Sequence, residues 1–406
     1  MTRCLICDAP IEPFISFGRM PIANGFLSRD RFADEYFFEL KAAFCPRCGM
    51  VQLVEQPEPG RMFHENYAFF SGTSARMAAH FKQFAEGMKT EHLQSEDPFV
   101  VEIGSNDGIM LKHFKQAGIR HVGIEPSANV AQVARENGIQ TICEFFDEAL
   151  ARRIVEEHGP ADLFLGANVM CHIPNLHSIV AGIKQLLKPR GVVVFEDPYL
   201  GDVIEKTSYD QIYDEHAFLF SVSSISYLFE QHGMEVVDVE PQGTHGGSMR
   251  YTLARRGMRP VTPAVAALRA REEMLGLNRP ETYDRLRGNI ERSRDALMAL
   301  LRECKRQGKR VAGYAATSKS TTVINYCGIT TELIEYISDT TPIKQGKYSP
   351  GAHIPIRPYE EFKASYPDYA LLFGWNHAEE IMANERKFKE AGGRFIVYVP
   401  KVQVLE

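Results

Sequence analysis

Three side chains that can transfer protons lie close together in the sequence, at Tyr213, Glu215 and His216. Histidine titrates nearest to neutral pH, and a neighbouring carboxylate can orient its ring and raise its basicity. Taken alone, the cluster is also compatible with a solvated loop. It follows the predicted strand 192–197, beside the edge of a sheet where loops carry functional groups. We therefore predict general acid–base chemistry in this segment.

A second group of reactive side chains forms two C-x-x-C pairs, Cys4 with Cys7 and Cys45 with Cys48. Each pair can offer two thiolates to one tetrahedral zinc, and a site filled with four sulfur ligands is structural rather than catalytic. The alternatives are four reduced thiols or a redox pair. Residues 1–58 are too few for an independent core, so we expect the metal to supply much of the folding energy of this module.

A third pattern is the apolar run 99–103, which is followed by Gly104, Ser105, Asn106 and Gly108 and carries the acid Glu102. Glycines at this spacing predict a buried strand that turns tightly into a helix, with a ligand at the carboxyl edge of the sheet. Ser105 and Asn106 stand where a second glycine would admit a pyrophosphate, so a cofactor without pyrophosphate fits better. The alternative is a purely structural turn.

Further polar residues are predicted at the same sheet edge. Glu125, followed by Pro126, ends the next strand and is placed to accept hydrogen bonds from ribose hydroxyls. Asn168 and His172 follow the fourth strand, although a histidine there is often a structural cap, and Cys171 is most simply a small buried apolar residue. The glycine pattern resembles the E-x-G-x-x-x-G motif of class I S-adenosylmethionine-dependent methyltransferases, which implies that cofactor.

Two glycine-rich or hydroxyl-rich pieces, 243–250 and 313–322, could hold phosphate oxygens through backbone amides, hydroxyls and a basic side chain. A tight turn and a helix cap are the respective alternatives. Residues 338–351 also follow a predicted strand and could help to hold a nucleotide. The predicted substrate-binding residues are Ser74, Gly246, Gly247, Arg250, Tyr314, Thr317, Ser318, Lys319, Asp339 and Lys347.

The elements that position these residues form an α/β protein with three parts. We expect a zinc-binding module at 1–58, a class I methyltransferase Rossmann-like domain at 59–258, and a helical linker with a smaller Rossmann-like domain at 259–406. Seven strands are predicted at 99–103, 121–125, 140–144, 161–166, 192–197, 234–240 and 249–253. A helix is predicted from 74 to 93, a helical stretch from 263 to 307, and further strands at 310–314, 333–338, 369–373 and 394–399.

Composition limits the class of protein. The chain has 406 residues, a net charge of -6 and eight cysteines. We expect no affinity for nucleic acid or anionic membranes, no disulfide framework, no membrane span and no signal peptide, and hence a cytoplasmic location. The oligomeric state is left open, with a monomer as one option.

The chain resembles the sugar C-methyltransferases that act on nucleotide-linked 4-keto-deoxysugars. The motifs that carry the resemblance are, in order, the cysteine pairs, the segment 66–74, the turn 102–108, His172 and the cluster 213–216. The resemblance covers essentially the whole chain. It implies that His216 is the catalytic histidine, beside Tyr213 and Glu215, and that Tyr67 and His172 are further active-site residues. Cys171 stands where this family usually has alanine, and Ala315-Ala316 where it often has Gly-Ala.

The resemblance implies methylation at C3 of a nucleoside-diphosphate 4-keto-deoxysugar, through an enolate formed by a histidine or tyrosine base. An alternative is a sugar O-methyltransferase, for which a base is equally useful but a ketone is not. Another is a zinc protein that binds S-adenosylmethionine or a nucleotide without catalysis. The sequence leaves open the nucleotide, the C3 substituent and the stereochemistry.

Overall fold

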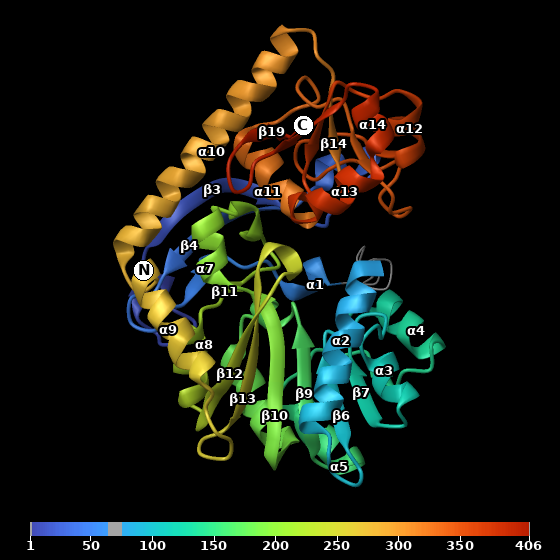
Figure 1. Cartoon of the computed structure of the whole chain (residues 1–406). Coiled ribbons are helices and arrows are strands. Elements are labelled where there is room, and N and C mark those ends of the chain that lie inside the picture. Colours follow the sequence, from blue (N-terminus) through green and yellow to red (C-terminus); the bar gives the residue numbers. More distant parts are fainter. Residues whose placement is uncertain (1, 64–74, 406) are drawn as a thin grey trace.

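The computed structural model describes residues 2–63 and 75–405, and Figure 1 shows their arrangement. Two α/β units, each built on its own sheet, are joined by a small N-terminal sheet that lies between them. The long helix α10 (Pro280–Arg306) contacts strand β3 (Pro13–Pro21) of the N-terminal sheet. In the described part of the chain, no helix is both long and apolar enough to cross a lipid bilayer.

The central sheet contains seven strands among the described residues, in the order β12-β13-β10-β9-β6-β7-β8. Strand β13 runs antiparallel to both of its neighbours, whereas the other neighbouring pairs are parallel. This confirms the seven predicted strands as one sheet, in which β13 is the reversed strand. The strands are β6 (Phe99–Ile103), β7 (Arg120–Ile124), β8 (Thr141–Ile142), β9 (Ala161–Ala167), β10 (Leu187–Pro198), β12 (Met234–Gln242) and β13 (Ser248–Arg255).

Alternating side chains of the central strands fill two separate cores, one on each face of the sheet. Val100 packs with helix α2, and its neighbour Val101 packs on the opposite face with α5, α6 and α8. Burial on both faces explains why β6 is apolar along almost its whole length. The surrounding helices are α2 (Ala75–His92), α3 (Leu111–Gln116), α4 (Ala128–Glu136), α5 (Glu148–His158), α6 (Leu176–Leu186), α7 (Leu200–Lys206) and α8 (Val222–Glu230).

The N-terminal sheet is completed by a strand from the central part of the chain. Its order is β11-β5-β4-β3, and β11 (Phe218–Leu219) pairs with β5 through Gln52 and Val51. The N-terminal module therefore shares its sheet with the segment that follows the predicted proton-transfer cluster. The other elements here are β1 (Thr2–Arg3), β2 (Pro10–Ile11), the 3-10 helix η1 (Arg29–Asp34), β4 (Phe37–Phe44), β5 (Val51–Leu53) and α1 (Pro59–Met62).

The C-terminal unit has a second, smaller sheet in the order β16-β15-β14-β17-β18-β19, parallel except for β19. Helix α11 (Ser318–Cys327) follows β14 and contacts β3 of the N-terminal sheet. The remaining elements are β14 (Val311–Tyr314), β15 (Ile337–Asp339), β16 (Ile356–Pro358), α12 (Tyr359–Ala364), β17 (Tyr369–Leu372), α13 (Ala378–Asn384), α14 (Arg386–Glu390), β18 (Arg394–Val397) and β19 (Gln403–Leu405).

Several predicted boundaries differ from the structure. The helical stretch 263–307 is two helices, α9 (Pro263–Leu275) and α10, because Gly276 adopts a left-handed φ of 70° and ends α9. The strand expected at 333–338 begins only at Ile337, since Thr330 accepts turn hydrogen bonds from Leu333 and Ile334. Strand β8 is shorter than expected, and β16 and β19 were not predicted.

Candidate active site

The turn after β6 has backbone conformations that restrict which residues fit there. Gly104 has a φ of +58°, and a Cβ atom there would lie 2.7 Å from Cγ2 of Val169. Asn106 also has a positive φ, of 49°. The Glu125 carboxylate accepts hydrogen bonds from the backbone N–H groups of Asn106 at 3.1 Å and of Ser127 at 2.8 Å. The turns that follow β6 and β7 are therefore joined at one edge of the sheet.

A cavity of ≈ 150 Å³ opens at this edge of the central sheet. Five of the predicted cofactor-binding residues line it, namely Gly104, Asn106, Glu125, Pro126 and Asn168. Phe63, Met77, Phe81 and Ile173 add apolar surface to the lining. A mostly apolar cavity with a few convergent polar groups is typical of sites for small organic ligands.

The other three predicted cofactor-binding residues, Glu102, Ser105 and Gly108, lie close in sequence to residues that line the cavity. Glu102 and Ser105 are buried, and burial raises the pKa of the Glu102 carboxyl well above its ordinary value, with Asp107 and Glu125 adding to the effect. Oε2 of Glu102 has no hydrogen-bond partner among the described residues. Gly108 has a packing role, because a Cβ atom there would lie 2.7 Å from Cγ1 of Ile139.

The predicted proton-transfer cluster forms a buried tyrosine–histidine pair. The ring of His216 is 2% exposed, and its Nε2 lies 2.9 Å from the hydroxyl of Tyr213. Its Nδ1 lies 2.7 Å from the carbonyl oxygen of Gln211, which can only accept a hydrogen bond. Nδ1 of a neutral His216 must therefore carry the proton, so Nε2 accepts a hydrogen bond from Tyr213.

Burial keeps this histidine neutral. Burial lowers the pKa of His216 well below its ordinary value, and the neighbouring His172 adds to the effect. Because Nε2 retains its lone pair at neutral pH, the pair is arranged to take a proton from Tyr213 or from a molecule that replaces the tyrosine hydrogen bond. The sequence suggested a carboxylate to orient this ring, but the Gln211 carbonyl orients it.

His172 connects this pair to the cavity. It belongs to the 3-10 helix η3 (Met170–His172), lines the cavity, and stacks on His216 with ring centroids 5.3 Å apart and planes inclined by 27°. The ring of Phe63 stacks on it as well, at 5.8 Å. Burial lowers the pKa of His172 to about 3. His172 is therefore a neutral, cavity-lining residue at physiological pH.

Replacing His172 with glutamine is expected to make stability less sensitive to acid. Unfolded His172 binds a proton near pH 6.5, whereas the folded protein keeps it neutral down to about 3. Its stabilising contribution is complete above pH 6.5 and is lost as the pH falls toward 3, by about 1.4 kcal/mol per pH unit. Urea denaturation of both proteins at about pH 7 and pH 5 measures the difference. Equal losses in the two proteins would contradict the prediction.

Residues of the N-terminal module form hydrogen bonds with the two carboxylates beside His216. The Glu215 carboxylate accepts a hydrogen bond from Nδ2 of Asn24 at 2.6 Å, and the Asp214 carboxylate accepts one from the backbone N–H of Ala23 at 3.0 Å. Burial raises the pKa of Asp214 well above its ordinary value, and Glu215 adds to the effect. The segment of the tyrosine–histidine pair is thus attached to residues that precede it by about two hundred positions.

The same segment is also held by His245, in the turn before β13, which in turn binds Lys319 of the C-terminal unit. The carbonyl of His245 accepts hydrogen bonds from Nε2 of Gln211 at 2.5 Å and from Nζ of Lys319 at 2.9 Å. Nearby, Asp210 accepts hydrogen bonds from Trp375 at 2.6 Å and Tyr398 at 2.8 Å. Gln211, which orients His216, is therefore fixed by elements from two parts of the chain.

The predicted substrate-binding residues do not all meet at the cavity. The Thr317 hydroxyl caps α11, Asp339 accepts hydrogen bonds from the backbone of Ala316 and Thr341, and Tyr314 donates to Glu385 at 2.7 Å. Lys319, at the start of α11 beside Ser318, donates a hydrogen bond to His245 in the glycine-rich turn before β13. Lys347 lies in a separate groove of ≈ 340 Å³.

Three further predicted residues lie in or just after the turn before β13, namely Gly246, Gly247 and Arg250. A Cβ atom at Gly246 would lie 2.4 Å from Trp375, and one at Gly247 would lie 2.1 Å from Asp202. Only glycine fits at these positions without rearrangement. The Nε of Arg250 donates to Glu196 at 2.7 Å and its Nη1 to Glu240 at 2.9 Å. Tyr67 and Ser74, which were also predicted, lie outside the described residues.

Two histidines near the site were not assigned from the sequence. His245 has a positive φ of 54° and lines the cavity, although the glycines beside it were noticed. His80, on α2, pairs with Glu196 through a 2.7 Å contact between Nε2 and Oε2. Its position within a helix gives no local signal, because the contact depends on a residue more than a hundred positions away.

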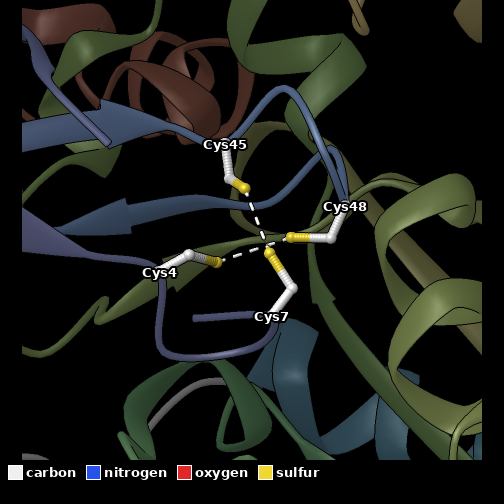
Figure 2. Close-up of side chains that lie close together, drawn as sticks. All are labelled: Cys4, Cys7, Cys45 and Cys48. Atoms are coloured by element: carbon white, nitrogen blue, oxygen red, sulfur yellow. Dashed lines mark hydrogen bonds between the residues drawn. The ribbon is translucent and has the colours of Figure 1, made fainter. Parts of the chain in front are cut away.

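The four predicted zinc ligands come together in the N-terminal module (Figure 2). The sulfur atoms of Cys4 and Cys48 lie 3.5 Å apart, and those of Cys7 and Cys45 lie 3.4 Å apart. All four lie within 4.8 Å of one another. Such a set of four thiols matches the ligands of a closed, tetrahedral structural zinc site. The zinc ion that this module binds therefore joins its two ends.

The cofactor site fits S-adenosylmethionine equally well. The cavity-lining Gly104, the carboxylate of Glu125 after β7, and the apolar cavity suit an adenosine and a methionine chain without pyrophosphate. Together, the seven-stranded sheet with its reversed strand and this site define a class I S-adenosylmethionine-dependent methyltransferase with a structural zinc module.

Comparisons with known proteins identify the family. The chain is 37% identical over 393 residues to the C-methyltransferase NovU of Streptomyces niveus, covering 96% of this chain and 93% of NovU. It belongs to this C-methyltransferase family. Three family models also match: a zinc binding domain at 4–63, a methyltransferase domain at 72–239 and a C-methyltransferase C-terminal domain at 243–400.

More distant similarities cover only part of the chain. The ubiquinone biosynthesis O-methyltransferase of Pasteurella multocida is 31% identical over 109 residues, which are 24% of this chain and 44% of that protein. The magnesium protoporphyrin IX methyltransferase of Synechocystis with bound SAM superposes with a TM-score of 0.33 and 12% identity, covering 44% of this chain and 79% of that chain.

Proposed function

We propose that the protein methylates C3 of a nucleoside-diphosphate-linked 4-keto-deoxysugar. Carbon becomes nucleophilic only when it can form a carbanion, and a ketone on the neighbouring carbon acidifies it by sharing the charge as an enolate. The observation that carries the proposal is the neutral His216. Its Nε2 accepts a hydrogen bond from the Tyr213 hydroxyl, and its ring stacks on His172, which lines the cavity. A C-methyltransferase needs such a base.

In the proposed mechanism, bound S-adenosylmethionine supplies the electrophilic methyl group. His216 acts as the base, either directly on the C3 proton or through Tyr213, whose hydroxyl already donates to Nε2. The Gln211 carbonyl keeps the second ring nitrogen protonated and so aims the lone pair of Nε2 at the reacting proton. Burial keeps the base uncharged at neutral pH.

The enolate oxygen needs a hydrogen-bond donor as negative charge develops on it. His172 lines the cavity beside His216 and is the proposed donor, with Tyr67 or Tyr213 as the alternatives. Glu215 has a positioning role in this scheme, because it attaches the segment to Asn24. A preorganised donor stabilises the charge without reorganisation of solvent.

We place the nucleotide and its diphosphate against the C-terminal unit, which would occupy residues 259–406 as a domain of its own. The glycine-rich turn 243–250 and Lys319 adjoin the catalytic segment, which supports this placement. The other predicted contacts are Ser74, Arg250, Tyr314, Thr317, Ser318, Asp339 and Lys347. The methyltransferase domain would then comprise 59–258 and the zinc module 1–58.

Replacing Tyr213 with phenylalanine is expected to lower kcat by roughly ten- to a thousandfold, because it removes the hydroxyl that His216 serves. The affinity for S-adenosylmethionine should change less than twofold or so, since Tyr213 does not appear among the residues that line the cofactor cavity. Steady-state kinetics and calorimetric titration of the cofactor measure both quantities. An unchanged kcat would exclude Tyr213 from proton transfer.

The proposed reaction is tested by incubating the protein with methyl-labelled S-adenosylmethionine and freshly generated 4-keto-6-deoxysugars on thymidine and guanosine diphosphate. Mass spectrometry and NMR then locate the label. Label on C3 of the sugar ring is the expected result and also identifies the nucleotide. Label on an oxygen atom would instead establish a sugar O-methyltransferase.

A further inference from the structure

Three potential metal ligands meet beside the catalytic pair, far in sequence from the zinc module. They are the thiol of Cys171 and one ring nitrogen each of His172 and His216, and these three atoms lie within 4.8 Å of one another. All three residues are buried. The proposed mechanism gives the thiol of Cys171 no part in catalysis.

Each of the two histidines has a ring nitrogen that can bind a metal ion. Nε2 of His172 is buried and has no hydrogen-bond partner among the described residues. His216 donates from Nδ1 to the Gln211 carbonyl, as metal-binding histidines commonly do, and Nε2 keeps its lone pair. A metal ion at Nε2 would replace the hydrogen bond from Tyr213.

The ligand set selects the class of metal. Two imidazoles and a thiolate suit Zn²⁺, Co²⁺ or Cd²⁺, with a water molecule in the fourth position. Around zinc, such ligand atoms lie roughly 3.3–3.8 Å apart, so rotations that move the three atoms by about 1 Å would close the site. Binding releases the thiol proton to solvent.

We propose that Cys171, His172 and His216 form a second metal site, which takes one Zn²⁺, Co²⁺ or Cd²⁺ ion and blocks catalysis when it is filled. The ion occupies the nitrogen that otherwise acts as the base, so the enzyme cannot remove a proton while the metal is bound. The inhibition rests on the proposed function of His216, whereas the binding does not.

The test is a titration of the zinc-loaded, full-length protein with Co²⁺. The expected result is one extra equivalent of metal by elemental analysis, with near-ultraviolet charge-transfer absorption from the new thiolate ligand. In Cys171→Ala the extra equivalent should be lost, or its affinity should fall at least tenfold. Cys304→Ala, which removes a buried cysteine from α10, is the matched control and should bind as the wild type does. Cys171→Ser serves as a second variant with a polar side chain of similar size.

Turnover measured with increasing Zn²⁺ or Cd²⁺ completes the experiment. Wild type and Cys304→Ala should lose activity as the extra equivalent binds, whereas Cys171→Ala should need at least tenfold more metal for the same loss. Absence of the extra equivalent in wild type, or its full retention in both Cys171 variants, would overturn the site. Binding that depends on Cys171 but leaves turnover intact would overturn the inhibition and the assigned role of His216, while the metal site itself would stand.

Discussion

Replacing His216 with asparagine is expected to lower turnover by roughly two to four orders of magnitude, the range that a positioned general base contributes. Asparagine removes the lone pair that accepts the Tyr213 hydroxyl, so neither residue can pass on the C3 proton. Steady-state kinetics with the 4-keto sugar substrate measure the loss. A further sign is the rate of deuterium exchange at C3, which should fall in parallel if enolate formation is the step affected.

The control for this variant is cofactor binding. The residues that line the cofactor cavity do not include His216, so the Kd for S-adenosylmethionine should stay within about twofold of wild type. Turnover near the wild-type rate would remove His216 from the role of base. Loss of cofactor binding as well would show that the ring is needed for structure, since Gln211 connects it to the turn at His245.

Replacing Cys48 with serine is expected to abolish stable zinc binding and, with it, most of the activity. Binding of structural zinc contributes on the order of ten kcal/mol or more to the folding of small zinc modules, and three sulfur ligands cannot close the site. The sulfur of Cys48 is buried 3.5 Å from that of Cys4, so the serine would leave a defect that water cannot readily fill. Elemental analysis and the thermal midpoint measure the result.

Activity should fall in this variant even though zinc takes no part in the reaction. The N-terminal module holds Asp214 and Glu215 through Ala23 and Asn24, so its loosening should displace the catalytic pair. Cys304→Ser is a suitable control, because it changes a buried thiol outside the zinc module. A Cys48→Ser protein that lacks zinc yet retains wild-type stability and turnover would contradict a structural role for the metal.

Much of the central fold could be predicted because its signals are local. Gly104 directly follows the apolar strand β6 and Glu125 directly follows β7, and strands of a parallel sheet bring such ends to one edge. The paired cysteines were equally clear, since their spacing matches the ligand geometry of zinc. These features depend on few residues and require no knowledge of distant contacts.

The features that the sequence did not reveal depend on contacts between distant parts of the chain. The carbonyl of Gln211 orients His216, but a backbone group carries no side-chain signal. His80 contacts Glu196 only because α2 passes that strand residue. Gly276 ends α9 within a stretch whose charged composition suited a continuous helix. Strand β11 is two residues long, too short for any periodic pattern.

That short strand has a consequence for how the protein is made. While the ribosome has released only β3, β4 and β5, the N-terminal sheet has an open edge at β5, which β11 later covers. Exposed strand edges invite pairing with other chains. The nascent polypeptide must therefore expose this edge until Phe218 and Leu219, which directly follow the segment of His216, emerge and pair with β5. The strand that closes this sheet therefore also fixes one end of the segment that contains His216.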